Sequence, residues 1–194
     1  MKNKDNMQEA LLAPTLKRGA HLELLISEQT ITRKIAQVAK SLDDEYKGQE
    51  ITIVMIMKGA LCLVADLIRH IQIPCSIEFI QASSYGAKGT KRGELSIFGL
   101  EKISLEKKHV LVVDDIFDSG ATLSEVMSRV KEQQPKSIKS LVLLSKNVPR
   151  KTVCHPDYVL FEIEDRFVVG YGLDYKEHYR GLPGVYALMM ENQT

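Results

Sequence analysis

The chain has little of several features that mark specialised classes of protein. Cysteine accounts for 3 of its 194 residues, without the spacing of a metal or redox motif, which predicts free, buried thiols in a reducing compartment. Lys and Arg total 26 and Asp and Glu total 25, and this formal charge of +1 gives no reason to expect nucleic acid or an anionic membrane as a partner. No apolar run approaches the ~18 residues of a membrane span. The first ten residues lack the apolar core of a signal peptide, so we expect a cytoplasmic protein.

Internal repeats and low-complexity segments are also absent, as is the glycine fingerprint by which Rossmann-type domains bind dinucleotides. A nucleotide-binding module of that type is therefore disfavoured. The composition, 44% hydrophobic and 26% charged, is typical of a globular protein. Because a chain of this length can bury a core of its own, we expect a single domain over residues 1–194.

Hydrophobic periodicity divides the chain into alternating strands and helices. The predicted strands are residues 21–26, 51–57, 76–82, 110–113, 138–144 and 158–163. The predicted helices run from the N-cap Ser27 to about residue 47, from 60 to about 70, and from 123 onward. This alternation predicts an α/β fold with a mostly parallel central sheet flanked by helices. Ligands of such folds bind at the carboxyl ends of the strands.

One predicted strand end carries an unusual group of polar residues. Residues 109–123 read HVLVVDDIFDSGATL, in which an apolar strand is followed by Asp114 and Asp115, a loop of small residues and the start of a helix. Backbone amides in such a loop, with the partial positive charge of the helix start, can bind a phosphate. Helix capping by Asp118 or Thr122 is the structural alternative. Capping leaves the paired carboxylates unexplained, which favours roles in binding ribose hydroxyls and in accepting a proton.

Three further stretches are expected at the same edge of the sheet. Lys58 and Gly59 form a strand-to-helix turn that suits a diphosphate, although such turns are common and usually only solvated. Residues 83–93 are rich in glycine, lysine and arginine, which predicts a mobile basic loop, with an ordinary charged hairpin as the alternative. Residues 145–181 include Phe167, for which core packing is the alternative to a role in binding a flat base.

The first of these patterns resembles a known family. Residues 112–123 resemble the signature of the type I phosphoribosyltransferases, in which this loop holds the 5-phosphate and ribose of phosphoribosyl pyrophosphate. The block from Lys146 to Arg180 closely resembles the base-binding hood of the hypoxanthine and hypoxanthine-guanine members. The resemblance spans about residues 20–190. It implies the type I phosphoribosyltransferase fold with a small hood subdomain, formed by the N-terminal segment and about residues 146–194.

The resemblance implies a role for each matching residue. The residues that would bind phosphoribosyl pyrophosphate are Lys58, Gly59, Ser84, Tyr85, Asp114, Asp115, Asp118, Ser119, Gly120, Ala121, Thr122 and Arg180. Those that would bind the purine are Lys146, Phe167, Val168 and Asp174. An ammonium donor suits a 6-oxo group and would sit badly against the amino group of adenine. The loop at Ser84 and Tyr85 would be a lid that excludes water from the reacting centre.

The implied reaction is attack of purine N9 on C1 of the ribose with inversion, which releases pyrophosphate and gives the nucleoside 5-monophosphate of purine salvage. Asp118 would be the catalytic residue, a general base that takes the proton from purine N7. Mg²⁺ would neutralise the pyrophosphate, because it prefers phosphate oxygens, water and few carboxylates. The residues implied to hold the metal are Asp114, Asp115 and Asp174.

Two features of the resemblance qualify this interpretation. Many members have a second glycine in the pyrophosphate turn, where this chain has Ala60, and in many the preceding Lys follows a cis peptide.

A regulator of the same fold, which binds phosphoribosyl pyrophosphate and catalyses nothing, is the alternative function. Such a protein should lose the general base or the lid and gain a DNA-binding domain, whereas this chain keeps both motifs and is expected to be too short for a second domain. The resemblance also implies small-molecule substrates and assembly as a homodimer or homotetramer.

Overall fold

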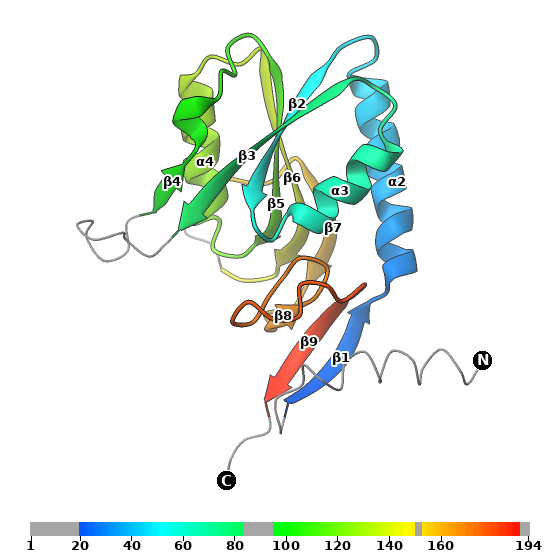
Figure 1. Ribbon diagram of the computed structural model, residues 1–194. Coiled ribbons are helices and arrows are strands. Elements are labelled where there is room, and N and C mark those ends of the chain that lie inside the picture. Colours follow the sequence, from blue (N-terminus) through cyan, green and yellow to red (C-terminus); the bar gives the residue numbers. More distant parts are fainter. Residues whose placement is uncertain (1–19, 84–94, 150–152, 191–194) are drawn as a thin grey trace.

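The computed structural model describes residues 20–83, 95–149 and 153–190, which form two sheets and the helices packed against the larger one (Figure 1). In chain order the elements are β1 (Ala20–Ile26), α2 (Glu28–Glu45), β2 (Ile51–Met57), α3 (Leu61–His70), β3 (Cys75–Ser83), β4 (Ser96–Phe98), η1 (Leu100–Lys102), β5 (His109–Phe117), α4 (Ala121–Glu132), β6 (Ser137–Lys146), β7 (Tyr158–Ile163), β8 (Val168–Val169) and β9 (Val185–Met190). Every strand and helix predicted from periodicity is present. The short elements β4, η1 and β8 and the strand β9 were not predicted.

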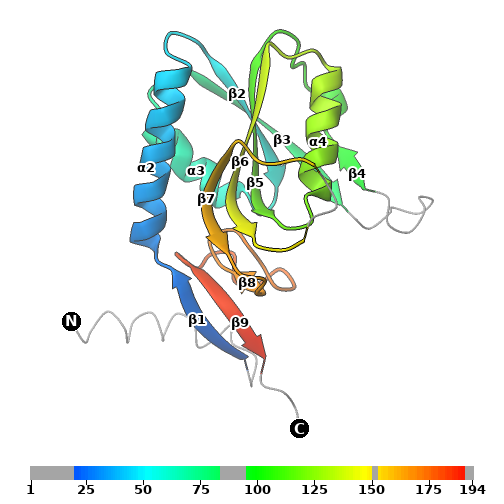
Figure 2. The same cartoon turned by 180° about the vertical axis from the view of Figure 1, so that it is seen from behind.

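The larger sheet has six strands in the order β4-β3-β2-β5-β6-β7. All neighbouring pairs are parallel except β3 and β4, which confirms the mostly parallel sheet. The strands β2 and β5 at its centre are apolar and buried almost throughout, because both faces of the sheet are covered, by α2 and α3 on one side and by α4 on the other (Figures 1 and 2). This arrangement gathers the carboxyl ends of the parallel strands at one edge, where ligands of such folds bind.

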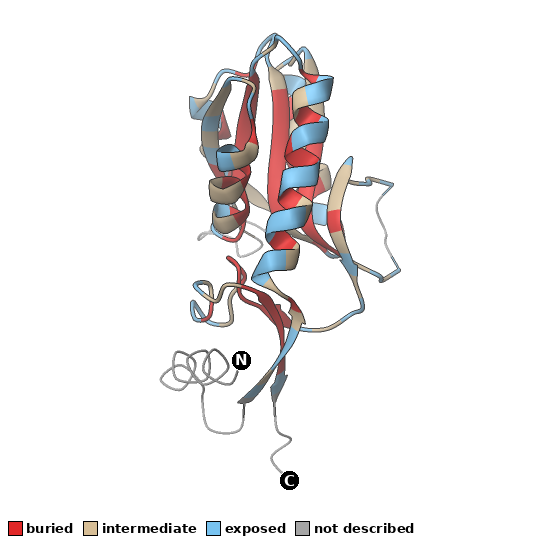
Figure 3. Cartoon of the chain, turned by 90° about the vertical axis from the view of Figure 1, so that its right-hand side faces the viewer, coloured by how far each residue is buried: buried red, intermediate tan, exposed pale blue. Residues whose placement is uncertain are grey.

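The helix α2 shows how the sequence pattern determines an element and its packing. The hydroxyl of Ser27 accepts a hydrogen bond from the backbone N–H of Thr30 at 3.3 Å and so begins the helix, as predicted. Its apolar residues recur at helical spacing and form one buried stripe against the sheet, which Figure 3 shows along its length. The buried residues of this stripe are Ile31, Ile35, Val38, Ala39 and Leu42.

The central strand β5 is longer than the sequence predicts. The expected strand ended at residue 113, whereas β5 continues to Phe117, because β6 extends beside it and Phe117 pairs with Ser145. Asp114 and Asp115 therefore lie inside a strand of the sheet and not in a loop after it. The same extension makes Lys146 the last residue of β6, next to the end of β5.

The second sheet has three antiparallel strands in the order β1-β9-β8. It pairs the first and last described segments of the chain and lies beyond the carboxyl ends of the parallel strands (Figures 1 and 2). We call this sheet, together with the connection 170–184, the hood. Its position confirms a small hood subdomain, but the hood does not begin near residue 146 as expected, because β7 pairs with β6 as the edge strand of the larger sheet.

The structure also bears on two predictions from composition. All three cysteines, Cys62, Cys75 and Cys154, are free, as predicted, but they are half-buried and not fully buried. Burial raises the pKa of each thiol. In the described part of the chain, no helix is both long enough and apolar enough to cross a membrane.

Candidate active site

A cavity of about 310 Å³ lies between the end of the central sheet and the hood. Six of the residues predicted for the site line it together, although they come from four separate segments of the chain. The lining residues are Asp115, Ile116, Asp118, Lys146, Phe167, Val168, Leu173 and Asp174. The parallel strands and the hood therefore bring together residues that the sequence only suggested would meet.

Lys146 enters this cavity from the end of β6 and is largely buried, with 13% of its side chain exposed. Its Nζ lies 2.9 Å from Asp165 Oδ1 and 3.7 Å from Asp118 Oδ2. Asp118 directly follows β5, so the ammonium and this carboxylate face each other because their strands are neighbours. Asp165 was not among the predicted site residues, although it lies within the block from Lys146 to Arg180 that resembles the base-binding hood, and this position could have indicated a role in the site.

Phe167 is 52% exposed and contributes no large surface to the core. Its ring meets the ring of Tyr175 edge to face, with the centroids 5.5 Å apart. The core-packing alternative is therefore wrong, and the exposed ring face can stack on a flat ligand. The next residue, Val168, is buried in β8 and pairs with Ala187 of β9, which fixes the backbone beside the cavity.

Asp114 and Asp115 are adjacent carboxylates at the end of β5. Asp114 is only 6% exposed, and its Oδ1 accepts a hydrogen bond from the N–H of Asp115 at 3.0 Å. Burial and the charge of Asp115 raise the pKa of Asp114 well above its ordinary value. Burial also raises the pKa of Asp115, against the opposing charge of Arg180. Two desolvated carboxylates side by side favour a bound cation or hydrogen-bond donors.

The turn between β2 and α3 packs closely on both of its neighbours. A Cβ placed on Gly59 would lie 1.6 Å from Asp115 Oδ2, and a Cβ placed on Gly172 of the hood would lie 2.1 Å from the carbonyl oxygen of Gly59. The Met57–Lys58 peptide is cis, as expected from many members of the family that the sequence resembles. The side chain of Ala60 is fully buried in the core and is not part of the cavity lining.

The loop after β5 leads into α4 without a side-chain cap. The N-cap is Gly120, whose φ of 81° is the left-handed conformation that glycine adopts readily, and the first-turn Ala121 N–H reaches Ser119 Oγ at 3.4 Å. The N-cap position is thus occupied by Gly120, and not by Asp118 or Thr122 as the capping alternative required. Helix starts of this kind present backbone N–H groups and partial positive charge to anions.

Charged residues on the hood form an ion-pair network beside the Lys58 turn. Arg180 Nη2 lies 2.7 Å from Asp174 Oδ1, and Arg180 Nη1 donates to the Gly172 carbonyl at 2.7 Å. Glu177 Oε2 lies 3.0 Å from Lys58 Nζ and 3.5 Å from Arg180 Nη2. Sequence reasoning missed Glu177, since no local pattern relates it to a residue 119 positions earlier.

The acidic residues suit a hard cation that brings most of its own ligands. Within residues 20–83, 95–149 and 153–190, no group of three or more His, Cys, Asp or Glu side chains is placed to hold a metal ion. Magnesium is commonly bound through one or two carboxylates, with phosphate oxygens and water completing its octahedron. The paired Asp114 and Asp115 match that donor set only if a phosphate ligand is also present.

The predicted lid residues Ser84 and Tyr85 lie outside the described residues.

A second cavity lies away from the predicted site. Its volume is about 390 Å³, and its lining includes Lys107, Lys136 and His109 but none of the predicted residues. Lys107 already pairs with Glu106, and Lys136 contacts a glutamine side chain, so we assign the site to the smaller cavity at the hood.

Comparisons with known proteins agree with this geometry. The chain is 40% identical over 170 residues to the hypoxanthine-guanine phosphoribosyltransferase of Aquifex aeolicus, covering 87% of this chain and 96% of that protein. It is 41% identical over 161 residues to the corresponding protein of Bacillus subtilis, covering 83% and 89%. A crystal structure of a hypoxanthine-guanine phosphoribosyltransferase from Bacillus anthracis superposes with a TM-score of 0.81 at 35% identity, covering 88% of this chain and 99% of that one. The family model named phosphoribosyl transferase domain matches residues 23–176 of this sequence. The chain therefore belongs to the phosphoribosyltransferase family.

Proposed function

We propose that this protein transfers the 5-phosphoribosyl group from phosphoribosyl pyrophosphate to N9 of a 6-oxopurine, hypoxanthine or guanine, in purine salvage. The observation that carries the proposal is the placement of Lys146 and Asp118 3.7 Å apart in one cavity with the exposed ring of Phe167. A hydrogen-bond donor, a proton acceptor and an aromatic face are the three groups that a 6-oxopurine nucleophile needs. The relatives named as hypoxanthine-guanine phosphoribosyltransferases support this choice of base.

Three groups recognise the base in this proposal. Lys146 exchanges its ion pair with Asp165 for a hydrogen bond that its ammonium donates to the purine 6-oxo group. Phe167 stacks on the ring, and the backbone of Val168 contacts the edge of the base, with Asp174 nearby. An amino group at the same position would place two donors against each other, and this explains rejection of adenine.

Asp118 acts as the general base. Its carboxylate takes the proton from purine N7 while the N9 lone pair attacks C1 of the ribose. The N9–C1 bond forms as the bond from C1 to the pyrophosphate oxygen breaks, and the configuration at C1 inverts. Lys146 lies beside this carboxylate, with its Nζ 3.7 Å from Asp118 Oδ2.

The remaining predicted residues hold phosphoribosyl pyrophosphate. Asp114 and Asp115 accept hydrogen bonds from the ribose hydroxyls, and the amides of the loop at Ser119, Gly120, Ala121 and Thr122 bind the 5-phosphate. Lys58, the Gly59 backbone and Arg180 bind the pyrophosphate. The Nε of Arg180 is buried and has no hydrogen-bond partner in the described part of the chain. The lid containing Ser84 and Tyr85 stays a prediction.

Magnesium is the cofactor that fits this donor set. Asp114, Asp115 and Asp174 would hold it, and phosphate oxygens of the substrate and water would supply further ligands. When bound, the ion neutralises charge on the leaving pyrophosphate. The homodimer or homotetramer, the cytoplasmic location and the single domain over residues 1–194 likewise stay predictions.

A steady-state assay tests the proposal directly. Phosphoribosyl pyrophosphate and magnesium are supplied with hypoxanthine, guanine, xanthine or adenine in parallel reactions. Turnover of 6-oxopurines but not of adenine is expected. Binding of phosphoribosyl pyrophosphate with no turnover of any base would contradict it and indicate a sensor of the same fold.

A further inference from the structure

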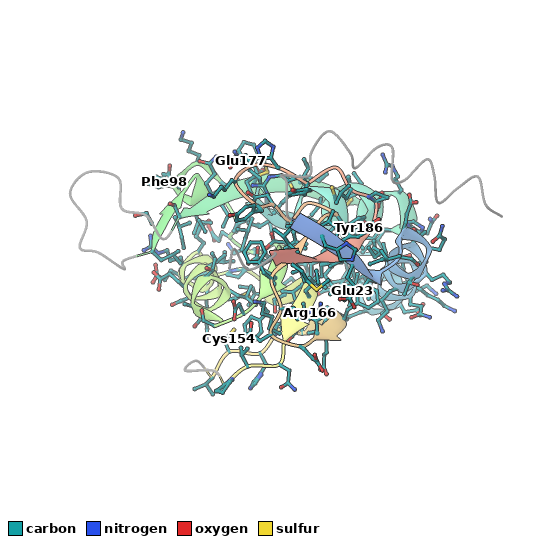
Figure 4. All side chains as sticks on the ribbon, turned by 90° about the horizontal axis from the view of Figure 1, so that it is seen from below. Glu23, Phe98, Cys154, Arg166, Glu177 and Tyr186 are labelled. Carbon is teal, nitrogen blue, oxygen red and sulfur yellow. The ribbon has the colours of Figure 1, made fainter. Side chains whose placement is uncertain are left out.

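Glu177 contacts two cations of the proposed pyrophosphate site, although it is not among the residues predicted to bind phosphoribosyl pyrophosphate. Its Oε2 lies 3.0 Å from Lys58 Nζ and 3.5 Å from Arg180 Nη2. Lys58 comes from the turn after β2 and Arg180 from the hood, so this one carboxylate bridges the two walls of the site. Figure 4 labels Glu177 and shows it on the opposite side of the hood sheet from the separate ion pair of Arg166 and Glu23.

The backbone holds Glu177 in this position. Its φ of 66° is left-handed, and its N–H donates to Asp174 Oδ2 at 2.8 Å. Non-glycine residues adopt this conformation rarely, and it persists where surrounding contacts impose it. Its neighbours Lys176 and Tyr179 also have positive φ values, of 53° and 75°. The turn therefore presents the Glu177 carboxylate to the two cations by its own conformation.

A carboxylate oxygen between an ammonium and a guanidinium resembles a phosphate oxygen in charge and in hydrogen-bonding geometry. Pyrophosphate bound to Lys58 and Arg180 would need the same donors, and two anions cannot share them without mutual repulsion. The carboxylate is 65% exposed, so it can turn out into solvent when another anion arrives. Its ion pairs are individually weak for the same reason.

We propose that Glu177 competes with pyrophosphate for Lys58 and Arg180 and thereby limits the affinity of the pyrophosphate subsite. This inference rests on the proposed function. When the subsite is empty, the carboxylate neutralises the two cations. When pyrophosphate has formed, the return of the carboxylate to Lys58 promotes release of this product. The ion pairs of the Glu177 carboxylate in the described part of the chain are with Lys58 and Arg180, the two cations of the proposed pyrophosphate subsite. We therefore expect affinity for the nucleotide product not to depend on it.

Isothermal titration calorimetry of Glu177→Gln tests this role, with magnesium pyrophosphate and, separately, inosine 5-monophosphate as ligands. Glutamine keeps the length of the side chain and removes its charge. We expect pyrophosphate to bind about two- to fivefold more tightly, as loss of a surface ion pair allows. The gain should shrink at high salt because exposed charges are screened. Affinity for the nucleotide should not change.

The matched control is Glu132→Gln, which removes the same charge at the far end of α4, away from the hood. Circular dichroism and a second variant, Glu177→Ala, guard against a local folding defect. Unchanged or weaker pyrophosphate binding in both Glu177 variants would overturn the competition and show that Glu177 instead holds the cations in place. Equal tightening by Glu132→Gln would also overturn it. If the unmodified protein binds neither ligand, the proposed function fails, and this inference fails with it.

Discussion

The carboxylate of Asp115 lies directly against the α-carbon of Gly59, with no space for a side chain between them. A methyl group on Gly59 would meet Asp115 Oδ2 at 1.6 Å and its Cγ at 2.4 Å. Asp115, which we propose binds the ribose and the metal, is therefore positioned by the turn at Lys58 and Gly59, which we propose binds pyrophosphate. On the other side, Gly172 brings the hood against the same turn. Displacement of any one of these segments should disturb the other two.

Gly59→Ala tests this packing. The added methyl group must push Asp115 or the turn out of place, so we expect kcat/KM to fall about 100-fold, as for a displacement of about 1 Å in an active site. The measurement is steady-state turnover of hypoxanthine. Gly181→Ala is the matched control in the hood, because a Cβ there meets nothing within 4 Å, and it should retain activity. Full activity in Gly59→Ala would show that the contact is dispensable.

Asp118→Ala removes the proposed general base. Proton transfer by a positioned side chain contributes about 10²- to 10⁴-fold, so kcat should fall within that range. Affinity for phosphoribosyl pyrophosphate, measured by calorimetry, should change little, because the neighbouring amides and carboxylates remain. Unchanged turnover would remove Asp118 from the mechanism.

Lys146→Ala removes the donor to the 6-oxo group. The ratio of kcat/KM for hypoxanthine to that for adenine should fall about 10- to 100-fold, as for the loss of a hydrogen bond to a charged group. Lys139→Ala, at the opposite end of the same strand, is the control and should leave the ratio unchanged, since Lys139 pairs with Glu45. An intact preference for 6-oxopurines in Lys146→Ala would assign base selection to another group.

Asp114→Asn should stabilise the fold at neutral pH. The folded-state pKa of Asp114 is raised above 3.8, mainly by burial, so its contribution to stability is fully present below that pH and is lost as the pH rises through the higher folded-state value. The free energy of unfolding of the variant should therefore be higher than that of the parent at pH 7, and the difference should shrink as the pH falls toward the ordinary pKa of an aspartate. Thermal unfolding without magnesium measures it.

The exposed Asp44→Asn is the control for a general charge effect and should change stability little at either pH. A parent protein as stable as Asp114→Asn at pH 7 would contradict the unfavourable burial of the Asp114 carboxylate. Catalysis should fall in Asp114→Asn, because the proposed ribose and metal contacts need an ionised group.

Much of this protein follows from short segments of its sequence. The order of strands and helices could be predicted because the apolar residues of each element recur with the period of a strand or a helix. In α2 they form the buried stripe from Ile31 to Leu42. Asp115 and Asp118 of the cavity were predicted because they lie in the contiguous signature from Asp114 to Thr122. The other predicted lining residues came from the resemblance of the block between Lys146 and Arg180 to the base-binding hood. Local patterns failed at the end of β5, because its extension to Phe117 depends on pairing with β6.

Only the tertiary structure decided which distant residues meet. Asp115, Gly59 and Gly172 are separated in the chain, and their contact arises from packing of the hood on the sheet. The same holds for the ion pair of Lys58 with Glu177 and for that of Lys146 with Asp165. Charged side chains far apart in the sequence carry no local signal for their partners, since Coulomb attraction depends on distance in space and on burial. The sequence thus determined the kinds of group available to the site, and the fold determined their pairing.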